Sequence, residues 1–245
     1  MKVAILGGYG VFGSRLAELL LRDGHDVVIL GRNAGKLAEL AKRLNCHYMV
    51  LDHRDDPPKL FSVSPEVVID AAGPFNSYTN VPYIVPRLCL ENGADYLDLS
   101  DDAEFTQGIT QLNESARSSN RRLLSGASSV PGISSAIAAD LCAGMDEIFL
   151  IDTAIMPGNR APRGASVVSS IISQLGTSPN VYRGGVWRRQ NCWSDPRQIE
   201  LAPNLSRTVR FIEVPDIRLF PKFFEAKSVI FRAGLELNIL NLAMI

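Results

Sequence analysis

The segment that decides the fold is Lys2-Val-Ala-Ile-Leu-Gly-Gly-Tyr-Gly-Val-Phe-Gly13, which continues as Ser14-Arg-Leu-Ala-Glu-Leu-Leu-Leu-Arg22. Residues 3–6 are all apolar, as expected of a strand that is buried on both faces of a parallel sheet. Gly8-Tyr-Gly10-Val-Phe-Gly13 is a G-x-G-x-x-G pattern between this strand and an amphipathic helix. We therefore predict a strand–turn–helix unit that binds a dinucleotide at the start of the helix.

Each glycine of this pattern has an expected role. Gly8 permits the tight turn, Gly10 keeps side-chain atoms away from a pyrophosphate, and Gly13 lets the helix pack close to the strand. The free N–H groups and the positive dipole at the start of the helix favour an anion. The alternative is a glycine-rich turn that binds no ligand.

The composition is that of an ordinary globular protein. The chain has 245 residues and a formal net charge of −1, so it predicts one large or two modest domains and no general attraction to nucleic acid or anionic membranes. Cys46, Cys89, Cys142 and Cys192 are widely spaced, which favours reduced thiols in a cytoplasmic protein and no metal site. The first strand begins directly after Met1, so we expect no signal peptide, and no apolar run approaches the ~20 residues of a membrane span.

Strand and helix patterns alternate along the first part of the chain. After the first strand, strands are expected at 27–30, 46–51, 67–71, 96–99 and 122–125, with helices between them. This order predicts a doubly wound parallel sheet, a Rossmann fold, over residues 1–145.

The remaining residues, 146–245, predict a second, smaller α+β domain. We expect strands at 147–155, 181–188 and 208–214, and a helix at 166–175. Residues 226–245 are apolar and look helical, and we expect this domain to be incomplete at its C-terminus.

Ligands of an open parallel sheet bind beyond the carboxyl ends of its strands. The second strand ends at Leu30-Gly31-Arg32, where a cation suits a 2′-phosphate and no acid is present for a ribose hydroxyl, so we predict NADP rather than NAD. The alternative is a solvated arginine. Asp52 ends the third strand, where an adenine edge would lie, although it could equally be a cap or loop acid. Ala72-Gly73-Pro74 follows the fourth strand, and its small residues would let the backbone approach the nicotinamide.

Catalytic residues cannot be named from the sequence. His25, His47 and His53 all precede the later strands of the sheet, and we interpret them as surface or packing residues. Neither a Tyr-x-x-x-Lys pair nor a G-x-S-x-G turn is present. Arg160 and Arg163 could receive a substrate carboxylate, although a solvated loop is the commoner arrangement.

Several segments together resemble the saccharopine dehydrogenase-like oxidoreductases. These segments are Gly7–Gly13, Gly31-Arg32, Ala72-Gly-Pro-Phe75, Cys89–Asp102 and Gly126-Ala-Ser-Ser-Val-Pro-Gly132, and the resemblance covers about the first 150 residues. It implies an NAD(P)-binding Rossmann domain joined to a second domain that shapes the substrate site and often mediates dimerisation. Members of the family usually return from the second domain to complete the first, and here the chain ends before such a return.

The resemblance also implies which residues form the site. The cofactor would be lined by Gly8, Tyr9, Gly10, Val11, Phe12, Gly13, Arg32 and Gly73-Pro74. Ser100, Asp101 and Ser129-Val130-Pro131 would lie close to cofactor or substrate.

Two functions are therefore expected. The first is an NADP-dependent oxidoreductase, a homodimer that transfers hydride between nicotinamide and a C=N, C=O or C=C carbon of a small or lipid-like substrate. The alternative is a non-catalytic NADP(H)-binding sensor or scaffold. A short-chain-dehydrogenase-like reductase is a third possibility, weakened by the missing Tyr-x-x-x-Lys pair.

Overall fold

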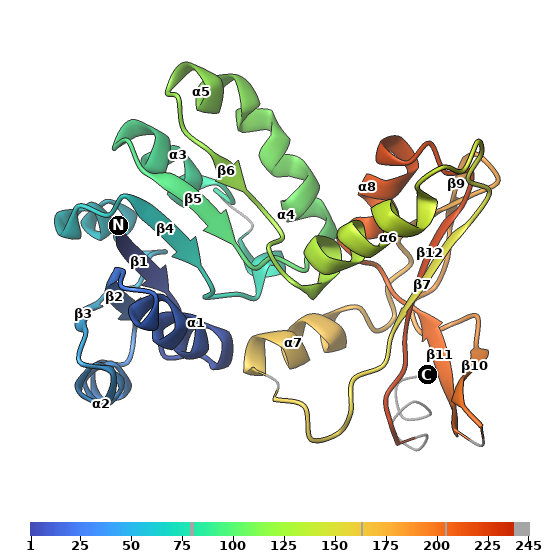
Figure 1. Cartoon of the computed structure of the whole chain (residues 1–245), viewed down its shortest axis with the longest axis horizontal. Helices are drawn as coiled ribbons and strands as arrows, with labels where there is room; N and C mark the ends of the chain where they lie inside the picture. Colours follow the sequence, from blue (N-terminus) through green and yellow to red (C-terminus); the bar gives the residue numbers. More distant parts are fainter. Residues whose placement is uncertain (79–80, 163, 204, 238–245) are drawn as a thin grey trace. The chain divides into compact units, whose positions relative to one another are not determined.

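The computed structural model describes residues 1–78, 81–162, 164–203 and 205–237 (Figure 1). It divides into two compact units. The first contains Met1–Ser100, Glu104–Ala127 and Gly164–Val167, and the second contains Asp101–Ala103, Ser128–Arg163 and the chain from Val168 onward. Residues 128–145 group with the second unit, whereas the sequence pattern places them in the first domain.

The first unit is a six-stranded parallel sheet in the order β3-β2-β1-β4-β5-β6. Its strands are β1 (Lys2–Leu6), β2 (Asp26–Gly31), β3 (His47–Val50), β4 (Val67–Asp70), β5 (Asp95–Asp98) and β6 (Leu123–Leu124). Its helices are α1 (Val11–Arg22), α2 (Ala34–Leu44), α3 (Ile84–Glu91), α4 (Ala103–Gly108) and α5 (Asn113–Ser118), with short 3₁₀ turns at Pro57–Val63, Phe75–Ser77 and Ile109–Leu112. The predicted Rossmann fold with a second α+β unit is confirmed.

Helices cover both faces of this sheet, because its central strands are apolar on both sides. Val3 and Ile5 of β1 pack in the core beneath α1 and α2, and Ala4 and Leu6 pack in the core on the other face. Figure 1 shows α1 and α2 on one side of the sheet and α3, α4 and α5 on the other.

The strand order reverses beside β1. From β1 the chain moves outward to β2 and β3, and it then returns to place β4 on the other side of β1. The connections after β1 and β4 therefore diverge, and the carboxyl ends of these strands are where sheets of this topology bind dinucleotides.

One glycine of the first turn has a different role from the one expected. Gly7 has a φ of +71° and makes the left-handed turn that we assigned to Gly8. Gly8 is needed for a close approach, because a Cβ there would lie 2.6 Å from the Cβ of Ile29. Gly13 has its expected role, since an added Cβ would overlap the carbonyl oxygen of Gly7.

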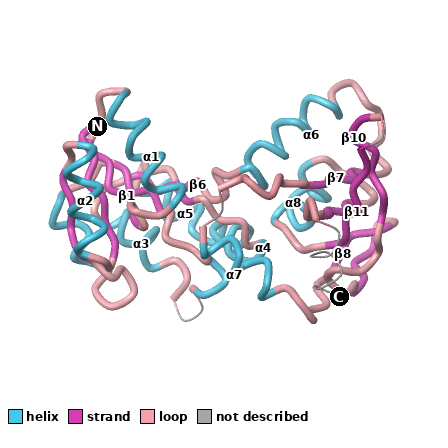
Figure 2. Tube along the Cα trace, turned by 90° about the horizontal axis from the view of Figure 1, so that it is seen from below, coloured by secondary structure: helices cyan, strands magenta, loops and turns pink. Residues whose placement is uncertain are grey.

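The second unit is built on a mixed sheet in the order β10-β11-β12-β8-β9, with β7 paired to β12 in parallel. Figure 2 shows strands of this unit in magenta. Its strands are β7 (Ile151–Ile155), β8 (Asn180–Arg183), β9 (Val186–Arg189), β10 (Arg197–Ala202), β11 (Leu205–Phe211) and β12 (Val229–Ala233). Its helices are α6 (Ser134–Cys142), α7 (Ala165–Ser173), whose first turn belongs to the first unit, and α8 (Pro215–Phe223).

The strand expected at 181–188 is instead a hairpin. Gly184 and Gly185 have φ angles of +59° and +80°, and they join β8 to the antiparallel β9. Two consecutive residues with positive φ form the tight turn that matches the twist of paired strands. A Gly-Gly pair is typical of such a hairpin, so the two glycines already indicated two strands rather than one.

The prediction of a helix over 226–245 is wrong where the structure describes it. Val229–Ala233 forms β12, which pairs with β7, β8 and β11, and residues 238–245 lie outside the described residues. Its buried Arg232 is neutralised by Asp152 at 2.5 Å and Asp195 at 2.8 Å. The strand expected from residue 147 begins only at Ile151, and neither β10 nor α8 was predicted.

Candidate dinucleotide-binding site

The glycine turn leaves the start of α1 open. Gly8 N donates to Leu30 O at 2.9 Å and Gly10 N to Gly7 O at 2.8 Å, which fixes the turn on the sheet. Gly10 caps α1 with its backbone, and the helix bonds begin with Ser14 N to Gly10 O. A Cβ at Gly10 would meet only Gly7 O, at 3.1 Å, apart from its own helix and chain neighbours. The helix start therefore has both the N–H groups and the space that a pyrophosphate needs.

Tyr9 closes one side of the turn. Its ring lies so close to Gly31 that any side chain at that position would overlap it. Lys36, in the first turn of α2, places its Nζ 5.8 Å from the centroid of the Tyr9 ring. Asn33 caps the start of this helix by accepting a hydrogen bond from Lys36 N at 3.0 Å. Lys36, four residues after Arg32, was not among the predicted site residues.

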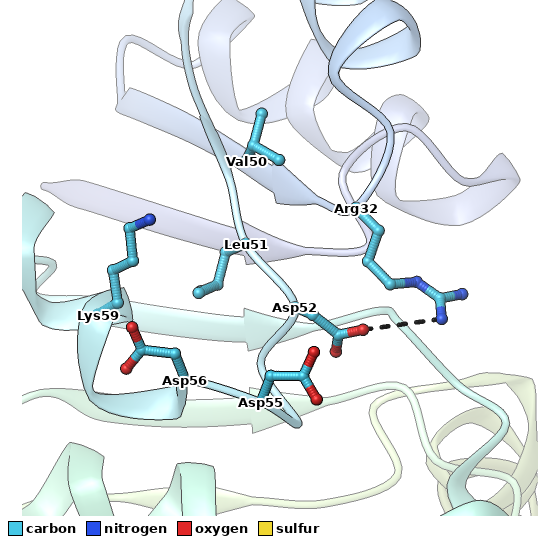
Figure 3. Close-up of a pocket in the computed structure, with 7 residues that line it drawn as sticks. All are labelled: Arg32, Val50, Leu51, Asp52, Asp55, Asp56 and Lys59. Carbon is cyan, nitrogen blue, oxygen red and sulfur yellow. Dashed lines mark ion pairs between the residues drawn. The ribbon is translucent and has the colours of Figure 1, made fainter.

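Arg32 stands at the rim of a hollow of about 290 Å³ at the ends of β2 and β3 (Figure 3). Its guanidinium Nη1 lies 3.9 Å from Asp52 Oδ2, and 69% of the Arg32 side chain is exposed. At that distance and exposure the ion pair is weak, so Arg32 remains available to an anion. The lining residues are Arg32, Val50, Leu51, Asp52, Asp55, Asp56 and Lys59.

The charges of this hollow argue against a phosphate inside it. Asp52, Asp55 and Asp56 outnumber the cations Arg32 and Lys59. Asp52 also shapes the loop, because its carbonyl oxygen accepts from both Asp55 N and Asp56 N at 3.2 Å. A neutral base with amino hydrogens suits such a hollow better than an anion does.

The loop after β4 is held by a buried carboxylate. Ala72 N donates to Asp70 Oδ1 at 2.9 Å, and the Gly73–Pro74 peptide bond is cis. A Cβ at Gly73 would lie 3.4 Å from the Cβ of Ser166, which comes from the first turn of α7. At Gly73 the loop after β4 therefore presents backbone atoms and no side chain at the carboxyl end of the sheet.

Ser100 and Asp101 have different surroundings. Ser100 is fully buried, and its hydroxyl accepts from Thr106 Oγ1 at 3.0 Å. Asp101 belongs to the second unit, where burial raises its pKa despite a hydrogen bond from Ser170.

His53 lies partly buried in the loop after β3. Its ring centroid is 5.4 Å from that of Tyr78, and burial followed by the Arg54 charge lowers the pKa of His53 to about 4. It is therefore neutral near pH 7 and has no extra proton to give.

The other predicted positions lie in the second unit. Val130 and Pro131 are buried, and Val130 joins the core of that unit. Arg160 is exposed, and Arg163 lies outside the described residues. No helix in the described part of the chain is both long and apolar enough to cross a membrane.

The family follows from a comparison with family models. The model of the saccharopine dehydrogenase NADP binding domain matches residues 3–125, which is half of the chain. The chain therefore belongs to the saccharopine dehydrogenase-like NAD(P)-binding family. None of the curated proteins matches the chain.

Two solved structures share the fold. The apo saccharopine dehydrogenase (L-Glu forming) from Saccharomyces cerevisiae is 17% identical with a TM-score of 0.70, over 95% of this chain and 54% of that one. GenD2 from gentamicin A biosynthesis, in complex with NAD, is 18% identical with a TM-score of 0.50, over 96% of this chain and 65% of that one. The chain thus spans about half the length of the yeast protein.

Proposed function

We propose that the chain is an NADP-dependent oxidoreductase that transfers hydride between nicotinamide and a C=N, C=O or C=C carbon of a small or lipid-like substrate. The observation that carries this proposal is the open start of α1 after β1, together with an exposed cation at the end of the neighbouring strand β2. The bound cofactor would supply the hydride, and the chain would supply position and charge.

The residues present fit such a cofactor. Gly10 has open space where a pyrophosphate would approach the N–H groups of α1, with Val11 and Phe12 exposed beside it. Arg32 and Lys36 would hold the 2′-phosphate, and the hollow lined by Asp52 would receive the adenine. Ala72, Gly73 and Pro74 would border the nicotinamide half.

NADP is favoured over NAD for an electrostatic reason. The ribose 2′-hydroxyl of NAD is usually accepted by an acid at the end of the second strand, and this position holds Arg32. The nearest carboxylate, Asp52, pairs with Arg32 and comes from the end of β3. A 2′-phosphate would replace this weak pair with a forked, charge-assisted contact.

Binding and turnover test the proposal separately. We expect NADPH to bind at least about tenfold more tightly than NADH, and Arg32→Ala to remove that preference. Arg43→Ala, which deletes an exposed arginine from the far end of α2, is the matched control and should keep the preference. Equal affinity for the two cofactors in the parent protein would refute the assignment of Arg32.

Turnover is then measured as loss of NADPH absorbance with imine, ketone and enoyl compounds. Oxidation with any of these classes supports the proposal. Tight binding of NADPH without oxidation by any of them would instead favour the non-catalytic sensor.

A further inference from the structure

Two fully buried aspartates lie side by side at the carboxyl ends of β4 and β5. The parallel register pairs Asp70 with Asp98, and neither side chain is reached by solvent. Among the described residues neither carboxylate forms an ion pair. Burying an unpaired carboxylate is costly, so its retention needs compensating contacts.

Those contacts go to the loops that follow three neighbouring strands. Asp98 Oδ1 accepts from Ser100 N, Gly126 N and Ser125 Oγ, each at 2.9 Å, so it ties the loop after β5 to the loop after β6. Asp70 Oδ1 accepts from Ala72 N at 2.9 Å, which fixes the loop after β4. The Tyr78 hydroxyl donates to both oxygens of Asp70, at 3.3 and 3.2 Å.

The place of these loops in the sheet indicates their purpose. A dinucleotide that crosses the carboxyl edge of such a sheet has its adenine half over β2 and β3 and its other half over β4 and β5. The loops held by Asp70 and Asp98 all lie on that second half. Arg32 and Asp52 lie on the first.

We propose that Asp70 and Asp98 are positioning residues for the nicotinamide half of the cofactor: together they fix the loops after β4, β5 and β6 without touching the adenine half. This inference rests on the proposed function. Burial raises the pKa of each aspartate to about 6, so both are mainly ionised near pH 7 and form charge-assisted hydrogen bonds to the loops.

The test compares two probes in the full chain, NADPH and adenosine 2′,5′-bisphosphate, which carries only the adenine half. Asp98→Ala should weaken NADPH by about tenfold or more, the effect of losing hydrogen bonds to a charged acceptor. It should leave the affinity for adenosine 2′,5′-bisphosphate within about twofold. Asp98→Asn keeps an acceptor oxygen but loses the charge, so it should weaken NADPH by a smaller but measurable factor and again leave the other probe unchanged. It serves as the test if the alanine variant does not fold.

Asp216→Asn is the matched control. Asp216 is also a buried aspartate with a raised pKa, but it lies in the first turn of α8 in the second unit. This variant should bind both probes like the parent.

If the Asp98 variants weaken both probes equally, the damage is general and the inference is overturned. The inference is also overturned if these variants bind NADPH as tightly as the parent. Either result leaves the proposed function standing, because the parent still binds NADPH. A parent chain that binds neither probe refutes the proposed function and this inference with it.

Discussion

Gly10 and Gly13 belong to one motif, but substitutions at the two positions should have different effects. A side chain at Gly10 should weaken cofactor binding, whereas a side chain at Gly13 should lower the stability of the fold. Gly10→Ala adds a methyl group that would meet only Gly7 O, at 3.1 Å, and the φ of −70° at this position suits any residue. Alanine is a somewhat poorer N-cap than glycine, while the unfolded chain becomes less flexible, and these effects are each below about 1 kcal/mol and opposed. We expect the unfolding free energy to change by about 1 kcal/mol or less.

The same methyl group would stand where the pyrophosphate approaches the helix. We expect Gly10→Ala to weaken NADPH at least about tenfold, which is about 1.4 kcal/mol. In Gly13→Ala the methyl would overlap Gly7 O and lie 3.0 Å from both Gly7 C and Gly8 Cα, all of them backbone atoms of the adjoining turn. Such overpacking should lower the unfolding free energy by roughly 3 kcal/mol, because α1 must move away from β1.

The assay is urea unfolding followed by circular dichroism, together with titration of NADPH fluorescence, on the parent and both variants. Our reasoning predicts a stable Gly10→Ala protein with poor binding and a clearly destabilised Gly13→Ala protein. It is refuted if Gly10→Ala binds NADPH as tightly as the parent while remaining folded. A Gly13→Ala protein as stable as the parent would show that the close approach of α1 to the turn is not required.

Three further changes test other parts of the structure. Lys36→Gln should weaken NADP⁺ by about fivefold and leave NAD⁺ unchanged in calorimetric titrations, since only NADP⁺ carries a 2′-phosphate; equal weakening of both would contradict the role of Lys36. Burial raises the pKa of Asp216 from 3.8 to about 6, so the folded state holds this proton more tightly and stability should fall by about 3 kcal/mol as pH rises from about 4 to about 6. Urea unfolding of Asp216→Asn should lack that part of the slope, and an unchanged slope would show that Asp216 does not titrate as argued. Gly185→Val should cost about 2 kcal/mol in the same assay because φ is +80°, whereas Gly184→Asn should cost less than about 1 kcal/mol; similar costs would count against the hairpin turn.

The first unit could be predicted because its signals are local. Val3–Leu6 is buried on both faces, and its apolar run is typical of a central strand. Asn33 caps α2 through Lys36 N, which lies only three residues further along the chain. The glycine pattern identified the turn correctly. It did not show that Gly7 rather than Gly8 takes the positive φ, because Gly7 stands outside the motif.

The second unit was less predictable because its strands are stabilised by distant partners. β12 contains Arg232, which interrupts the apolar run over residues 226–245 that we interpreted as a helix. In the structure this side chain pairs with Asp152, eighty residues earlier, and with Asp195. No pattern within one segment contains that information.

The proposed site also has one part that local sequence predicts and one part that depends on distant partners. Arg32 follows its strand directly and remains exposed, so its charge at the end of β2 could be recognised from the sequence. Asp98 instead reaches Gly126, twenty-eight residues further along, and in the sequence it is only a polar residue at the end of a strand. The exposed charge of Arg32 would determine the preference for NADP over NAD. The hydrogen bonds of the buried Asp98 would fix the positions of the loops. Cofactor preference should therefore change readily through substitutions at Arg32 and Lys36, whereas substitutions at Asp70 and Asp98 should disturb the loops after β4, β5 and β6.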